Sequence, residues 1–449
     1  MKYSTMFSIF MGLFLFTMAS CIDEETPTQF TEEDMPMIYM EWAADYIYGL
    51  GDTIHFTAQV SPGDMVETRW LVNGEVVSEE LTISYPVLSS EPFNLRFEVE
   101  RHGLTNFRTA NVTVTKEFEA KNYNKIVLGV VSPEATLGSI QWDNITHLMY
   151  SSLVVDNTVP TLTTPDASSL ERLRSFVTAA HNNGVYVIID ITGPINYLNG
   201  AGFYNETSFN EVAINPEKRT KLITDIKAFV DEYNLDGVNI YINNLNNDAG
   251  GLSDKEGITA FMNELGESLP QERPAPRDEF FFTASVPMAW NNYEFYHLAN
   301  VPRLNWVNFM LFGGVDLSPV HHAPSWQVND NIARFQNAGL PVSKMLIGIG
   351  AFGVQYNLNG ATPTWGNLDS FLQYRPYKEI VKLDANAANL NQLPFGDGLF
   401  YSGVTDANAK ADNTISSNAA GMFIWTMEND SQAEGISLTG AVNDKLNNP

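Results

Sequence analysis

Cysteine, basic residues and metal-binding patterns are all scarce in this 449-residue sequence. Its one cysteine, Cys21, rules out a disulfide within the chain. Lys and Arg number 25 against 53 Asp and Glu, and the net charge of −28 argues against a nucleic-acid partner, which needs basic patches. His321 and His322 are direct neighbours in a predicted loop, and no His pair or Cys cluster has metal-ligand spacing, so we expect neither metal nor cofactor. A lightly charged chain with 12% aromatic residues suits neutral ligands that bind by stacking and hydrogen bonding.

Long apolar runs are missing beyond the amino terminus, so we expect no later segment to span a membrane. Residues 1–20 contain Lys2 and then the apolar run Met6–Met18, which is the pattern of a signal peptide. Small residues directly before Cys21 resemble a bacterial lipoprotein cleavage box, which implies that Cys21 is acylated. The alternative is a cysteine that follows an apolar run by chance. The expected contact with a membrane is through this lipid anchor only.

Residues 21–36 are polar and acidic, contain two prolines, and are typical of a tether. Asp23, Glu24 and Glu25 resemble the acidic tag that sends lipoproteins of the Bacteroidetes to the outer face of the outer membrane. The resemblance implies a lipid-anchored protein on the cell surface. Three acids in a solvated linker are also common, and this remains the alternative.

Short alternating runs between turn residues indicate an all-β sandwich over residues 37–117. Asn73-Gly74 predicts a hairpin, because its tight turn needs two residues with positive φ. Trp70 resembles the core tryptophan of immunoglobulin-like and PKD-like modules, so we expect it in the core of a spacer domain. The predicted strands are Asp52–Val60, Glu67–Val72, Glu79–Tyr85, Phe93–Val99 and Arg108–Val114.

Strand-like and helix-like segments alternate over residues 118–449, which is typical of parallel β/α architecture. Eight strand candidates predict an α/β TIM (β/α)8 barrel, whose active site lies at the carboxyl ends of the strands. The fold class is therefore multidomain, an immunoglobulin/PKD-like sandwich followed by a barrel. The predicted barrel strands are Ile126–Val131, Ile145–Val154, Val185–Ile191, Leu235–Asn244, Phe280–Pro287, Trp306–Phe312, Met345–Gly350 and Ala420–Thr426, and the predicted helices include Leu170–Asn182, Pro216–Tyr233, Gly257–Leu269 and Asn331–Ala338.

The fourth of these strands carries polar residues where a covered barrel strand is normally aliphatic. Val238 and Ile240 alternate with Asn239, Tyr241 and Asn243, so one face is aliphatic and the other polar. Without further context, these polar residues are equally well explained as core residues with satisfied hydrogen bonds.

This strand resembles the fourth-strand pattern D-G-x-D-x-D-x-E of glycoside hydrolase family 18, the chitinases and endo-β-N-acetylglucosaminidases. Asp236 and Gly237 match the pattern, whereas Asn239 and Tyr241 stand in place of aspartates and Asn243 in place of the glutamate. In that family the N-acetyl oxygen of the substrate is the nucleophile, the inner aspartate orients the acetamido group, and the glutamate is the general acid.

An amide has no proton to give, so Asn243 cannot act as a general acid. Losing a positioned acid costs about 10²–10⁴ in rate. The resemblance therefore implies an inactive barrel that binds N-acetylglucosamine-containing glycans, either chitin-like or N-glycan. By analogy with glycan uptake in the Bacteroidetes, an outer-membrane glycan transporter and companion hydrolases would be its partners.

Other barrel strands resemble the same family. The end of the third strand resembles its S-x-G-G, with Asp190 in the place of the serine. The sixth strand has Phe312 where the family's M-x-Y-D has its tyrosine, and Trp425 corresponds to the tryptophan that floors the sugar pocket. The predicted ligand-binding residues are Asn239, Tyr241, Asn243, Trp425, Trp290, Phe312, Asp190 and Tyr150.

Two other functions stay open. Asp190, Glu428 and Asp430, near the ends of the third and eighth strands, could supply a relocated acid, with Tyr241 as a proton donor. The protein would then be an active chitinase or endo-β-N-acetylglucosaminidase. Alternatively, the barrel is a protein–protein scaffold, which predicts no glycan affinity.

Overall fold

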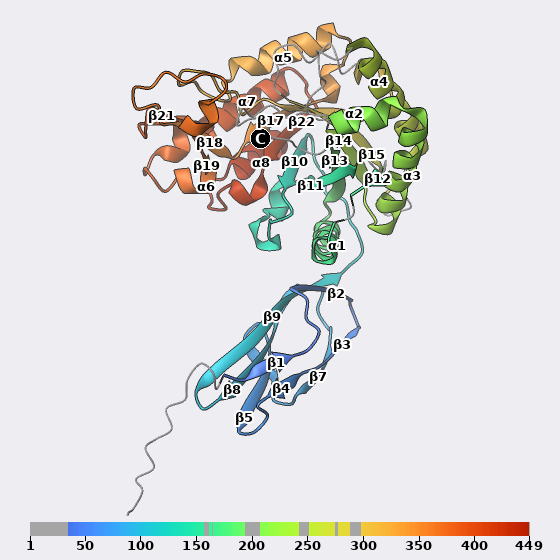
Figure 1. The fold of residues 1–449 in the computed structure, drawn as a ribbon, viewed down its shortest axis with the longest axis vertical. Helices are drawn as coiled ribbons and strands as arrows, with labels where there is room; N and C mark the ends of the chain where they lie inside the picture. The colour runs from blue at the N-terminus through green and yellow to red at the C-terminus, as the bar shows by residue number, and fades with distance from the viewer. Residues whose placement is uncertain are drawn as a thin grey trace, which may run out of the picture.

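A computed structural model describes residues 35–156, 161–163, 165–193, 207–241, 251–273, 277–287 and 298–448. Within them the chain forms an amino-terminal β domain and a barrel surrounded by helices (Figure 1). The predicted signal peptide and lipidated Cys21 lie outside the described residues, as do Asn243 and Trp290. In the described part, no helix combines the length and the apolarity needed to span a membrane.

The β domain is built around Trp70. One sheet has the strand order β2-β9-β8-β5-β6, and the pairs β1-β4 and β3-β7 form two smaller sheets. The Trp70 side chain is fully buried, stacks on Phe56 at 6.0 Å and donates its indole N–H to the carbonyl of Glu80 at 3.1 Å, so the predicted core position is confirmed. The likeness to immunoglobulin-like modules stays a prediction. The strands are β1 (Met37–Tyr39), β2 (Asp45–Gly49), β3 (Thr53–Thr57), β4 (Gln59–Ser61), β5 (Val66–Val72), β6 (Glu75–Ser78), β7 (Thr82–Pro86), β8 (Phe93–Arg101) and β9 (Leu104–Thr115).

The hairpin at Asn73-Gly74 is also confirmed. Both residues have positive φ, 51° and 86°, and they join the antiparallel strands β5 and β6. The pair fixes this turn because asparagine and glycine tolerate the left-handed region that other residues avoid. Strand β6 was not among the predicted runs.

Eight parallel strands close the barrel, as predicted. Neighbouring strands follow the order β10-β22-β17-β16-β15-β14-β13-β11, and β10 pairs with β11 to complete the ring. The register places Asp190 opposite Asn239, Asn239 opposite Thr283, and Ser285 opposite Asn308. The strands are β10 (Ile126–Val131), β11 (His147–Asp156), β13 (Tyr186–Thr192), β14 (Gly237–Tyr241), β15 (Phe281–Pro287), β16 (Trp306–Met310), β17 (Met345–Gly350) and β22 (Gly421–Trp425).

Helices cover the outside of the barrel, and an additional sheet lies between β17 and β22 in the chain (Figure 1). This antiparallel sheet has the order β19-β18-β21-β20 and was not predicted from the sequence. The helices are α1 (Ala167–Asn182), α2 (Thr207–Ile214), α3 (Pro216–Glu232), α4 (Gly251–Ser268), α5 (Trp326–Asn337), α6 (Tyr377–Ile380), α7 (Val404–Ser416) and α8 (Leu438–Asn447). The remaining strands are β12 (Thr161–Leu162), β18 (Phe352–Tyr356), β19 (Leu372–Pro376), β20 (Gln392–Leu393) and β21 (Gly398–Tyr401). The short 3-10 helices are η2 (Leu137–Ser139), η3 (Trp142–Asn144), η4 (Leu298–Asn300), η5 (Val342–Lys344), η6 (Leu368–Phe371), η7 (Ala387–Asn389) and η8 (Met427–Asn429).

The two faces of each barrel strand pack into different cores. Outward side chains such as Val238 and Ile240 join the apolar core beneath the helices. Inside, the amino end of the barrel is closed by rings, with His147 between Phe281 at 4.7 Å and Trp306 at 5.3 Å. Burial lowers the pKa of His147 to about 3, so its imidazole is neutral and packs as a ring. Farther along β13 to β16 the buried polar side chains include Asp190, Asn239 and Asn308.

The β domain meets the barrel at this closed amino end. Strands β2 and β9 lie against α1, and the amide of Lys116 donates to the side-chain oxygen of Asn182 at 2.9 Å. After β9, Phe118 packs its ring on Tyr186 at 5.1 Å, beneath the first residues of β13. The β domain is thus attached opposite the end where TIM-barrel enzymes carry their sites.

Candidate functional site

A layer of buried polar side chains crosses the barrel at β13 to β16. We call it the polar layer. Each strand contributes inward-facing side chains, because residues two apart on a strand share a face. Its members, all at most 4% exposed, are Asp190, Asn239, Thr283, Ser285 and Asn308.

Asn239 is the centre of the polar layer and makes four hydrogen bonds. Its Nδ2 donates to Asp190 Oδ1 at 2.6 Å and to Ser285 Oγ at 2.9 Å. Its Oδ1 accepts from Thr283 Oγ1 at 2.7 Å and from Asn308 Nδ2 at 3.0 Å. A side-chain amide has two donors and two acceptor lone pairs, so these bonds use its full capacity. A ligand would have to displace one of the four partners to contact Asn239, whose predicted role in binding stays a prediction.

The hydrogen bonds of the polar layer run in one direction. The Trp306 indole, which can only donate, donates to Asn308 Oδ1 at 3.0 Å. At the other end Asp190 accepts from Asn239 and, through Oδ2, from the hydroxyl of Ser151 at 3.2 Å. A chain that starts at an obligate donor and ends at a carboxylate fixes the orientation of both amides between them.

Asp190 is the carboxyl group of this layer. It is 1% exposed, and burial raises its pKa to about 6, while its bonds to Asn239 and Ser151 oppose that shift. Near neutral pH the carboxyl group is therefore mostly ionised, which agrees with its role as the acceptor of hydrogen bonds from Asn239 and Ser151.

Tyr241 lies one step closer to the carboxyl end of β14. It is half-buried, and its backbone is paired opposite Thr192 of β13 and Ser285 of β15. The polar alternation predicted for this strand is thus present through Tyr241. Asn243, the last position of the pattern, is beyond the described part of the strand.

An aromatic cluster occupies the opposite side of the barrel. Trp425, at the end of β22 and only half-buried, stacks on Phe312 with centroids 6.3 Å apart and an interplanar angle of 28°. Phe312 is 7% exposed and also contacts Phe352 at 5.9 Å, so it supports Trp425 from behind. Gly350 on β17 makes room, because a Cβ there would lie 2.6 Å from the Phe352 ring. The peptide bond that follows Trp425 is cis.

Tyr150 does not join either group. Its ring packs on Phe176 of α1 at 5.7 Å in the core beneath the helices, and burial raises its pKa to about 12. The neighbouring Ser151 points inward instead and contacts Asp190. The side chain that β11 brings to the polar layer is therefore Ser151 and not Tyr150, because a shift of one residue reverses the face of a strand.

The two acids after β22 differ in their surroundings. Asp430 is 3% exposed and accepts hydrogen bonds from the amides of Leu438 and Thr439 at 3.0 and 2.9 Å, and from the Thr439 hydroxyl at 2.7 Å. These bonds tie it to the first turn of α8, a capping role. Glu428 lies in η8, and its Oε2 is buried with no hydrogen-bond partner in the described part of the chain.

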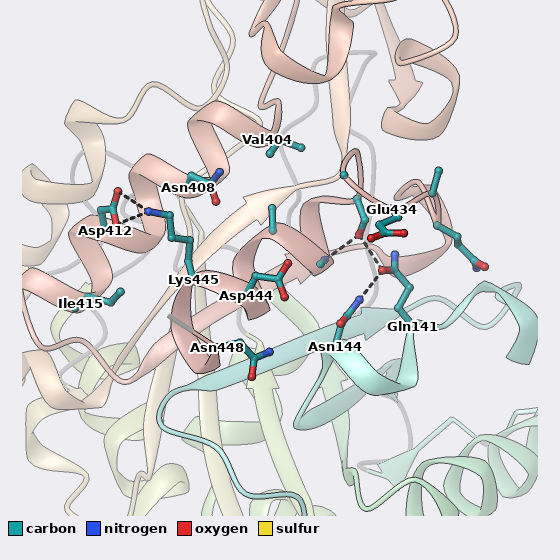
Figure 2. Close-up of a pocket in the computed structure, with 16 residues that line it drawn as sticks. Gln141, Asn144, Val404, Asn408, Asp412, Ile415, Glu434, Asp444, Lys445 and Asn448 are labelled. Atoms are coloured by element: carbon teal, nitrogen blue, oxygen red, sulfur yellow. Dashed lines mark hydrogen bonds and ion pairs between the residues drawn. The ribbon is translucent and has the colours of Figure 1, made fainter.

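A cavity of about 880 Å³ lies away from both groups, between α7, α8 and the segment around η3. In Figure 2 the Lys445 side chain reaches Asp412, an ion pair of 3.2 Å, and Asn144 points to Gln141, to which it donates at 2.9 Å. None of the predicted ligand-binding residues lines it. Among the residues that the structure describes, no group of three His, Cys, Asp or Glu side chains is arranged to hold a metal ion.

The family model for the glycosyl hydrolases family 18 matches residues 119–430, which is more than half of the chain. The chain belongs to this family. Among curated proteins, a chitinase-like effector of Moniliophthora perniciosa is 22% identical over 299 residues, which cover 62% of this chain and 64% of the relative. The chain thus spans less than two thirds of the length of that relative.

Solved structures share the family 18 fold. A chitinase from Bacteroides thetaiotaomicron has a TM-score of 0.56 and 22% identity, covering 72% of this chain and 96% of that one. A chitinase-like agglutinin from Robinia pseudoacacia has a TM-score of 0.58 and 17% identity, covering 71% and 99%. At these identities the likeness establishes the fold.

Two residues of the polar layer differ from the family 18 patterns that the sequence resembles. Asp190 stands in the place of the serine of S-x-G-G, and its partner Asn239 stands in the place of an aspartate. Sequence reasoning singled out both residues separately. Thr283, Ser285 and Asn308 were not predicted, although Thr283 and Ser285 are two residues apart on one strand and Asn308 is the single polar residue of the next.

Proposed function

We propose that this family 18 barrel binds N-acetylglucosamine-containing glycans, chitin-like or N-glycan, without hydrolysing them. The main observation behind this proposal is that the hydrogen bonds of Asp190 and Asn239 are made within the protein. The carboxyl group of the polar layer is buried and accepts from two protein donors, and its amide partner has no free hydrogen-bonding capacity.

Hydrolysis in this family needs an acid that can reach the glycosidic oxygen. The sequence places an amide, Asn243, at the acid's position, and an amide cannot supply that proton. Asp190 is enclosed in the layer, and Asp430 is held by the first turn of α8. These contacts argue against Asp190 and Asp430 as replacement acids, and they favour a site that binds sugars without an acid at the family's position. Glu428, whose Oε2 has no hydrogen-bond partner among the described residues, is the third carboxyl group to test.

Binding would rest on the aromatic cluster. The half-buried indole of Trp425 stacks on Phe312, and a flat indole face is suited to the C–H face of a pyranose ring. This contact needs no charge, which agrees with a chain that carries few charged residues.

The test is a calorimetric titration of residues 22–449 with N-acetylglucosamine oligomers and with a released N-glycan, followed by product analysis. We expect a saturating isotherm and no shortened products. Asn243→Glu restores the family residue at that position, and its product analysis shows whether the acid alone was missing. Shortened oligomers from the wild-type protein would disprove the non-catalytic function.

We also propose that the protein is a lipoprotein of the outer membrane, exposed on the cell surface and anchored through Cys21. The attachment of the β domain at the closed amino end of the barrel supports this, because the strand ends that carry Trp425 then lie opposite the domain next to the anchor. A transporter for glycans and companion hydrolases would be its partners. Radiolabelled palmitate should enter the wild-type protein and not Cys21→Ala, and protease added to intact cells should release the barrel. Protection of the barrel in intact cells would contradict the surface location.

One observation favours an active enzyme as the second candidate. Burial raises the pKa of Asp190 to about 6, so a fraction of this carboxyl is protonated near neutral pH, which an acid catalyst requires. If product analysis shows cleavage, the Asp190→Asn variant tests whether Asp190 is the acid. Loss of cleavage in that variant would support Asp190 as the relocated acid, and unchanged cleavage would exclude it.

A further inference from the structure

The hydroxyl group of Ser285 accepts two hydrogen bonds inside the polar layer. Asn239 Nδ2 donates to its Oγ at 2.9 Å, and Asn308 Nδ2 donates at 3.2 Å. An amide nitrogen cannot accept a hydrogen bond, so both lone pairs of the serine oxygen are used. The hydroxyl hydrogen is left to donate to a group outside this pair of amides.

The groups at the two ends of the chain of hydrogen bonds determine that both amides turn their nitrogen to Ser285. Trp306 can only donate, so Asn308 turns its oxygen to the indole and its nitrogen to Ser285. Asp190 accepts, so Asn239 turns its nitrogen to the carboxylate and to Ser285. The indole donor at one end and the carboxylate acceptor at the other therefore determine the orientation of both amides.

Ser285 is also the member of the layer nearest to the open end of β15. Asn239, Thr283 and Asn308 are fully buried, whereas Ser285 keeps 4% exposure. It lies two residues beyond Thr283 on the same face, opposite Tyr241 in register. Among the residues that the structure describes, no side chain or carbonyl accepts the hydrogen of its hydroxyl.

We propose that Ser285 donates this hydrogen bond to the carbonyl oxygen of the acetamido group of a bound N-acetylhexosamine, and so makes the site select N-acetylated sugars. The inference rests on the proposed glycan binding and adds the atom that recognises the acetamido group. The family pattern implies that a tyrosine hydroxyl on the sixth strand contacts this group, and Phe312 has no hydroxyl at that position. Two amide N–H groups on its oxygen polarise the Ser285 hydroxyl and make it a stronger donor.

The experiment measures selectivity between two neutral tetrasaccharides, the N-acetylglucosamine tetramer and cellotetraose, which has hydroxyls in place of the acetamido groups. Wild-type protein should bind the acetylated tetramer more tightly. Ser285→Ala should reduce that ratio about three- to tenfold, the effect of one hydrogen bond to a neutral acceptor. Ser285→Thr, which keeps a hydroxyl, should retain most of it.

Ser151→Ala is the matched control. It removes a serine hydroxyl that contacts the polar layer, but one that donates to Asp190 at 3.2 Å within the protein. It should leave the ratio unchanged even if it lowers the melting temperature. A similar loss of selectivity in Ser151→Ala, or an equal loss of affinity for both sugars in Ser285→Ala, would overturn the assignment.

A second measurement compares the two complexes directly. A tetramer labelled with ¹³C at the acetamido carbonyl should show one carbonyl signal that lies downfield in the complex with wild-type protein relative to the complex with Ser285→Ala, because accepting a hydrogen bond deshields that carbon. Binding without such a shift would overturn the role of Ser285 and leave the proposed function standing. Absence of binding to either sugar would instead refute the proposed function itself.

Discussion

The side-chain amide of Asn239 donates to the carboxylate of Asp190 across 2.6 Å. The two residues come from neighbouring strands. By comparison with the family 18 patterns, a carboxylate replaces a serine at Asp190, and an amide replaces a carboxylate at Asn239. The polar layer therefore holds one carboxyl group, and Asn239 and Ser151 donate to it. The consequences for stability and for binding can be measured separately.

Asp190→Asn should change the pH dependence of stability. The folded protein raises the pKa of Asp190 from 3.8 to about 6. The contribution of the neutral carboxyl group to the free energy of unfolding is therefore fully present below about pH 4 and is lost as the pH rises through 6. Ionising the buried group costs on the order of 3 kcal/mol above that window. The melting temperature of the variant minus that of the wild type should therefore be higher at pH 7.5 than at pH 4.5. An equal difference at both values would contradict the shifted pKa.

Asn239→Asp should destabilise the barrel at pH 7.5. It would place a second carboxylate beside Asp190 and remove the N–H that Ser285 accepts, at a cost of about 2–4 kcal/mol. The loss should be smaller at pH 5, where the two carboxyls can share a proton. Adding Asp190→Ser, which restores the family's arrangement, should recover most of the lost melting temperature. A double variant no more stable than Asn239→Asp alone would show that the two positions are not coupled.

Trp425→Ala should weaken binding of the N-acetylglucosamine tetramer about 10- to 100-fold, or about 1.4–2.8 kcal/mol, because a large stacking surface is removed. Calorimetry measures the change. Trp142→Ala is the control, since Trp142 lies in η3 and packs on the core beneath the helices. It should lower the melting temperature and leave the affinity unchanged. Equal losses of affinity in both variants would indicate a general loss of folded structure.

Tyr150→Phe should leave glycan binding unchanged and should not lower the melting temperature. The Tyr150 hydroxyl is buried without a hydrogen-bond partner among the described residues, so removing it leaves no other group unpaired. Thermal unfolding and the same titration check both expectations. A drop in affinity would place Tyr150 in the site, against its packing on Phe176.

Asp430→Ala should lower stability by about 1–3 kcal/mol through the loss of its bonds to α8, with no effect on glycan affinity. Thermal unfolding gives the first value and calorimetry the second. Asp444→Ala in the same helix but outside these bonds is a suitable comparison. An unchanged melting temperature together with altered binding would move Asp430 from a structural role into the site.

The order of strands and the polar face of β14 could be predicted because both depend on local patterns. Strand β10 and strand β17 begin and end where the alternation predicts, and Trp70 lies in the core as expected. The sheet β18 to β21 escaped prediction because its strands are short and lie among loop-like residues. Tyr150 was predicted to bind ligand, but its side chain lies in the core beneath the helices, because a shift of one residue along a strand decides which face a side chain occupies.

By itself the sequence determined which residues occupy the fourth-strand pattern. It therefore also determined that positions 239 and 243 carry amides, Asn239 and Asn243, and no carboxyl group. Only the tertiary structure decided how those residues are used. Asp190, Asn239, Ser285 and Asn308 are separated by tens of residues in the chain, and their hydrogen bonds exist because parallel strands bring them into one layer. Local periodicity sets the face of a side chain, but the register between strands sets its partners, and partners determine whether a polar group is free to meet a ligand.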